Sequence, residues 1–110
     1  MPNSLDLDKL SDFVEEWWDK SALPSLCEFV EIPALSPSFD SEWEANGYLD
    51  AAVNTFIAWT RSLPLKGLTV SVHRLKNRSP LLLLKIEGDE DGEVLFYSHL
   101  DKQPEATGWS

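Results

Sequence analysis

Histidine, cysteine and basic residues are scarce in this sequence. Its 110 residues include two histidines, one cysteine and nine Lys or Arg against nineteen Asp or Glu, which gives a formal net charge of −10. Proteins bind the phosphates of nucleic acids mainly through Lys and Arg, so this balance argues against nucleic acid as a partner. The single cysteine, Cys27, cannot form a disulfide within the chain.

Long hydrophobic runs are also lacking. The longest, Leu81–Leu84, is far below the roughly 20 residues that a membrane span needs. The first ten residues, MPNSLDLDKL, have neither the basic start nor the apolar core of a secretory signal. We therefore expect a cytoplasmic protein without a membrane partner. The length and the 43% hydrophobic content predict a single globular domain.

Apolar residues at three- and four-residue spacing predict helices in the first half of the chain. The first helix is expected from about Asp6 to Lys20. A second, short helix is expected to start between Ser21 and Pro24, because proline is tolerated in a first helical turn. It should end at Ile32, since the residue before Pro33 is pushed toward extended geometry, and Cys27 should be buried on its apolar stripe.

A third helix is predicted between residues 41 and 63. Ser41 and Glu44 have the spacing of a capping box, although Asn46 and Gly47 weaken the first turn. The apolar stripe that follows consists of Leu49, Val53, Phe56, Thr60 and Leu63. Pro64 should stop this helix.

The second half of the chain predicts strands. Apolar and polar residues alternate from Leu68 to His73, which is typical of a strand with one buried face. The nearly continuous apolar run Leu81–Ile86 predicts a strand covered on both faces, and Glu93–Tyr97 a third strand. The predicted fold is therefore α/β, with N-terminal helices followed by three strands of a mixed sheet.

His99 and Asp101 come where the third strand should end, and open α/β sheets place their ligands at such ends. Residues i and i+2 of an extended segment face the same side, so both polar groups should share one crevice. A neutral imidazole is a good zinc ligand, and its second ring N–H is usually held by a carboxylate. Taken alone, the pair also fits a solvated turn, and His73 fits the exposed face of its strand.

The residues around His99 and Asp101 indicate a more specific function for this pair. VLFYSHLDKQPEATGW, from Val94 to Trp109, together with the upstream LPSLCEFVEIPALSPSF, resembles the co-catalytic zinc peptidase and deacylase family. That family includes carnosinase-type dipeptidases, acetylornithine deacetylase, succinyl-diaminopimelate desuccinylase and aminoacylase, and its dipeptidase branch has the form YGHLD-x-QP followed by GW. Here Ser98 stands where glycine is commonest, and Lys102 replaces the more usual valine.

The resemblance implies a function and roles for two residues. His99 would be a ligand of one of two zinc ions, for which cobalt or manganese can substitute, and Asp101 the catalytic-site residue that orients its ring. The activity implied is hydrolysis of a small peptide or N-acyl amino acid, most similar to that of a dipeptidase. Residues 1–110 would be the N-terminal part of the catalytic domain of an enzyme that forms a homodimer through a lid domain absent from this sequence.

The same resemblance implies that this chain is inactive alone, because the family's other metal ligands and its general-base glutamate follow the first motif. An alternative class of function is a small, non-catalytic binding or interaction module that retains the front end of the fold. A third hypothesis is a split enzyme, in which a second chain supplies the remaining ligands.

Overall fold

The structure of the protein is a computed structural model that describes residues 4–109. The chain divides into two compact units, Met1–Glu31 and Ile32–Ser110. Within the described residues, no helix has both the length and the apolar character needed to cross a membrane.

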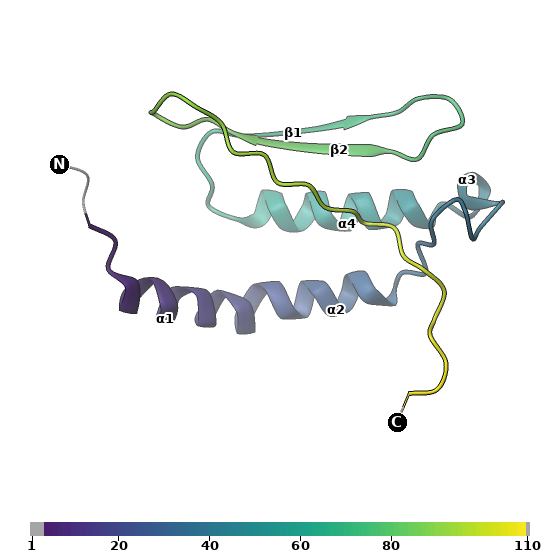
Figure 1. Ribbon diagram of the computed structural model, residues 1–110, viewed down its shortest axis with the longest axis horizontal. Helices are drawn as coiled ribbons and strands as arrows, with labels where there is room; N and C mark the ends of the chain where they lie inside the picture. The colour runs from purple at the N-terminus through teal and green to yellow at the C-terminus, as the bar shows by residue number, and fades with distance from the viewer. Residues whose placement is uncertain (1–3, 110) are drawn as a thin grey trace. The chain divides into compact units, whose positions relative to one another are not determined.

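The first unit is a helical segment with an irregular middle (Figure 1). Helices α1 (Leu7–Trp17) and α2 (Leu23–Glu31) are joined by one π-helical turn, η1 (Trp18–Ala22). The N–H of Leu23 donates to the carbonyl of Trp18, five residues earlier. Pro24 has no N–H for the regular helical ladder, which accounts for the irregularity at this point. The predicted start of a second helix between Ser21 and Pro24 is confirmed at Leu23, although η1 joins this helix to α1 without a break.

The ends of this unit follow the sequence more closely. The carboxylate of Asp6 accepts a hydrogen bond from the Lys9 N–H at 3.1 Å and so caps α1. Helix α2 ends at Glu31, just before Ile32 and Pro33, as predicted. Cys27 is exposed, so the prediction of its burial was wrong: neither α1 nor α2 has any fully buried residue.

The second unit begins with a short helix, α3 (Trp43–Asn46), and a long one, α4 (Tyr48–Ser62). Gly47 separates them with a φ of +71°, in the left-handed region that glycine adopts without steric cost. The predicted capping box is not formed. Instead, the Asp40 carboxylate accepts hydrogen bonds from the Glu42 N–H at 3.0 Å and from Nδ2 of Asn46 at 2.9 Å, which fixes this turn.

Helix α4 supplies most of the core of the second unit. Its buried residues are Leu49, Ala52, Val53 and Thr60, and Ala34 is the other fully buried apolar residue. Three of the five stripe positions predicted from the sequence are thus buried. The Thr60 hydroxyl donates to the Phe56 carbonyl at 2.8 Å, so this buried polar group is satisfied within the helix.

The sheet of the second unit is an antiparallel hairpin. Strand β1 (Leu68–His73) pairs with β2 (Leu81–Ile86), with Leu68 opposite Ile86 and His73 opposite Leu81. The hairpin runs along α4 (Figure 1), and Arg74, directly after β1, forms an ion pair with Asp50 of α4. The predicted strands Leu68–His73 and Leu81–Ile86 are therefore confirmed.

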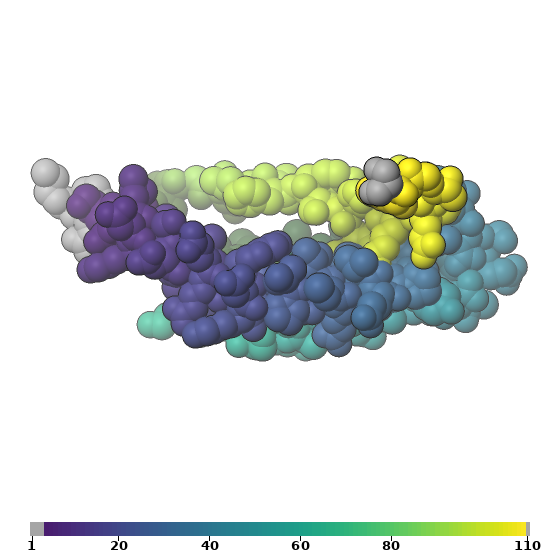
Figure 2. Space-filling view, turned by 90° about the horizontal axis from the view of Figure 1, so that it is seen from below, coloured from purple at the N-terminus to yellow at the C-terminus, as the bar shows by residue number. Residues whose placement is uncertain are grey.

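The third predicted strand is absent from the described residues. The side chains of Val94–Tyr97 are between 81% and 92% exposed, and this segment pairs with neither strand of the hairpin. Figure 2 shows the green-to-yellow C-terminal segment at the surface of the molecule. The mixed helix-and-sheet class is correct, but the sheet is two-stranded and antiparallel, not three-stranded and mixed. Leu81, Leu83 and Leu84 are exposed, so two-sided burial of β2 was also wrong.

Candidate functional site

The C-terminal segment is anchored to the second unit at Lys102. Leu35 and Lys102 form an isolated parallel bridge. In it, the Lys102 N–H donates to the Ala34 carbonyl and the Ser36 N–H donates to the Lys102 carbonyl, each at 2.9 Å. Ala34 is fully buried, so these bonds fasten the end of the exposed segment to a residue of the core.

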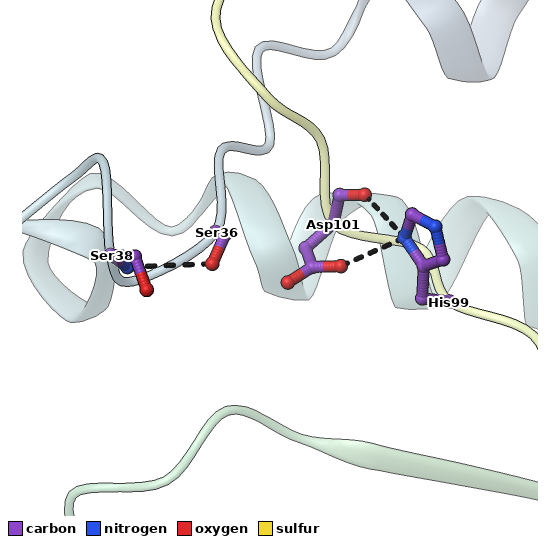
Figure 3. A network of polar contacts seen from close by, with 4 residues as sticks. All are labelled: Ser36, Ser38, His99 and Asp101. Carbon is purple, nitrogen blue, oxygen red and sulfur yellow. Dashed lines mark hydrogen bonds and ion pairs between the residues drawn. The ribbon is translucent and has the colours of Figure 1, made fainter.

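His99 and Asp101 lie just before this anchor, and their side chains meet (Figure 3). Nδ1 of His99 is 3.0 Å from the carboxylate Oδ1 of Asp101 and 2.8 Å from the Asp101 backbone carbonyl oxygen. The imidazole is exposed and the carboxylate half-buried. The contact that the sequence predicted between these two residues is present.

The two acceptors determine which nitrogen of His99 can bind a metal. Both groups that contact Nδ1 are oxygen acceptors, so Nδ1 carries the proton and donates. The lone pair then lies on Nε2. A carboxylate that holds the second ring nitrogen in this way fixes the ring and raises the basicity of the nitrogen that binds the metal. The arrangement is common among metal-bound histidines, and zinc binding by His99 stays a prediction.

The two stretches of sequence that carry the resemblance border one open hollow of about 290 Å³. The later stretch supplies His99 and Asp101, and the earlier one supplies Ser36 and Phe39 across from them. In Figure 3 the turn at Ser36 faces the pair, and it is held by a hydrogen bond from the Ser38 N–H to the Ser36 hydroxyl at 3.4 Å. The remaining lining residues are Tyr97, Lys102 and Gln103.

The side chain of Lys102 adds a contact to the earlier stretch. Its ammonium donates to the carbonyl of Ile32. Burial lowers the pKa of Lys102 below its ordinary value. This bond supplements the two backbone bonds that Lys102 makes in the bridge.

No complete metal site is found among the described residues. His73 lies exposed on β1, hydrogen-bonded to the Ser71 hydroxyl at 3.3 Å, and does not line the hollow. No group of three or more His, Cys, Asp or Glu within residues 4–109 could hold a metal ion. Catalytic zinc takes about three protein ligands plus water. The donor chemistry of His99 fits one such ligand, and the others are not among the described residues.

The sequence matches no model of a known protein family and no curated protein.

Two features of the site were missed from the sequence. Phe39 and Ser36 lie in a serine- and proline-rich loop that has no periodicity to indicate a position beside His99. Lys102 was assigned no role. The family resemblance includes both the loop and the His-x-Asp segment, which indicates that the two share a site. It does not indicate which residues of the two stretches are in contact.

Proposed function

We propose that this chain is the N-terminal part of the catalytic domain of a zinc-dependent amide hydrolase of dipeptidase type. The observation that carries the proposal is the hydrogen bond between Nδ1 of His99 and the Asp101 carboxylate, which leaves Nε2 as the metal-binding nitrogen. Support also comes from the hollow where the two resembling stretches meet. The substrate class is a small peptide or an N-acyl amino acid.

In this proposal each residue of the pair has one role. His99 binds the metal through Nε2, and Asp101 keeps the proton on Nδ1 and fixes the plane of the ring. Zinc, when bound, supplies a Lewis acid that polarises the amide carbonyl and lowers the pKa of water. The second zinc site, the remaining ligands and the general base belong to residues outside those described.

The test is hydrolysis of a panel of dipeptides and N-acyl amino acids by the protein as its own cells produce it, with and without a chelator. His99→Ala should abolish the zinc-dependent activity. His73→Ala is the matched control, because it removes the other histidine from an exposed strand position, and it should leave the activity unchanged. The 110-residue chain alone should be inactive.

Activity that survives His99→Ala would overturn the assignment, and so would turnover by the 110-residue chain with zinc. If the natural protein hydrolyses none of these amides, the non-catalytic interaction module becomes the better hypothesis. The exposed apolar segment Val94–Tyr97 is the observation that favours that second function, because large exposed apolar patches mark interaction surfaces.

A further inference from the structure

Lys102 makes three hydrogen bonds to one short stretch of chain. Its backbone bonds Ala34 and Ser36, and its ammonium bonds the carbonyl of Ile32. The Ile32 carbonyl also accepts from the Ala34 N–H at 2.8 Å, so the chain turns between Ile32 and the bridge. The lysine therefore bonds this turn as well as the bridge that follows it.

Only one of these bonds depends on the side chain. Any residue except proline could make the two backbone bonds at position 102. The bond to the Ile32 carbonyl requires a long side chain with a charged donor, which valine, the usual residue of the resembling family, does not have. The half-buried position of Lys102 excludes part of the water that would compete for this carbonyl.

The position of Lys102 in the chain connects this contact to the site. It directly follows Asp101, whose carboxylate and carbonyl oxygens both accept from Nδ1 of His99. The segment before it, residues 94–97, is exposed and makes no strand pairing. The anchor at Lys102 is therefore the nearest restraint on the Asp101 backbone, and a shift there would move both oxygens relative to the imidazole.

We propose that Lys102 is a positioning residue: its ammonium, fixed on the Ile32 carbonyl, holds Asp101 where it keeps the His99 proton on Nδ1. The importance of this role for catalysis rests on the proposed zinc hydrolase function, but the role itself needs no metal. It also gives a structural role to the lysine that follows Asp101.

The experiment measures the tautomer of neutral His99 in the ¹⁵N-labelled chain, from the chemical shifts of its two ring nitrogens, without metal. Lys102→Met retains the length and the apolar stem of the side chain but removes the ammonium. In this variant His99 should lose the Nδ1–H tautomer, and the tautomer of His73 should stay unchanged. Lys102→Arg should restore it, because a guanidinium also donates to a carbonyl. Lys66→Met, at an exposed lysine in the turn before β1, is the matched control and should change nothing.

A thermal melt of each variant separates positioning from stability. An unchanged tautomer in Lys102→Met would overturn the proposal, whether or not the melting temperature falls. An equal change in Lys66→Met would also overturn it. The two proposals can fail separately: if the natural protein hydrolyses none of the amides in the panel above, the hydrolase proposal fails while the tautomer still tests Lys102. Where zinc does bind, Lys102→Met should weaken binding by about tenfold, as loss of support to a ligand does.

Discussion

Nδ1 of His99 lies 3.0 Å from the carboxylate Oδ1 of Asp101, with a single residue between the two in the chain. The same nitrogen is 2.8 Å from the Asp101 carbonyl oxygen, so one residue supplies both acceptors. The two partners of this contact are neighbours in the chain, so it does not depend on a third strand. It explains how a tautomer suited to metal binding can exist although residues 94–97 pair with neither β1 nor β2.

The first prediction concerns the carboxylate of this pair. Asp101→Asn should reduce the affinity of His99 for zinc by about tenfold, because a neutral amide supports the ring less than a carboxylate does. The measurement is a zinc titration followed at the imidazole nitrogens. Asp91→Asn makes the same change of charge in the exposed turn after β2 and should leave the affinity unchanged. Equal losses of zinc affinity in both variants would mean that the affinity depends on the net charge of the chain and not on the contact of Asp101 with His99.

The second prediction tests the position of the core. Leu49→Ala should lower the free energy of unfolding by about 2 to 4 kcal/mol, because it removes a buried side chain from α4 and leaves a cavity. Phe96→Ala deletes a larger side chain, but one that is 89% exposed. It should change the free energy of unfolding by less than about 0.5 kcal/mol. Denaturant unfolding followed by circular dichroism measures both. A larger loss for Phe96→Ala would show that residues 94–97 are packed.

These two positions also show how much of the fold the sequence could predict. Leu49 lies on a stripe of helical period, and such a pattern depends only on neighbours along the chain, so α4 and three of the five buried positions were predicted correctly, whereas the break at Gly47 was not. Phe96 lies in an apolar run that was read as a strand. A strand also needs a hydrogen-bonding neighbour, which a local pattern cannot supply. The contact of His99 with Asp101 was predictable because it is local, whereas that of Lys102 with Ile32 spans 70 residues.

The third prediction concerns the junction of α3 and α4. Gly47 has a φ of +71°, and a Cβ added there would meet nothing within 4 Å. Gly47→Ala should therefore destabilise the chain through backbone strain alone, by roughly 1 kcal/mol. Gly88→Ala is the control, because Gly88 also has open space around it and has no positive φ. The free energy of unfolding measures both variants, and equal values for the two would contradict the strain argument.

The fourth prediction concerns pH and the first unit. Lys20 Nζ lies 2.6 Å from Oε1 of Glu16, and this contact lowers the pKa of Glu16 below its ordinary value of 4.5. The contribution of the pair to folding is then present above pH 4.5 and is lost as the pH falls through the lowered pKa. Lys20→Gln should raise the pKa of Glu16, measured by ¹³C chemical shift of its carboxyl carbon. Lys66→Gln should leave that pKa where it was, and a pKa insensitive to Lys20→Gln would refute the contact.

The most direct test of the central claim is a zinc titration of the ¹⁵N-histidine-labelled chain, because it asks which nitrogen binds the metal. The account predicts that Nε2 of His99 responds at lower zinc concentration than either nitrogen of His73, while Nδ1 of His99 keeps its proton. A response at Nδ1 of His99 would contradict the account, as would equal responses of the two histidines. Equal responses would favour the solvated turn, whereas a response at Nδ1 would mean that Asp101 does not keep the proton on that nitrogen.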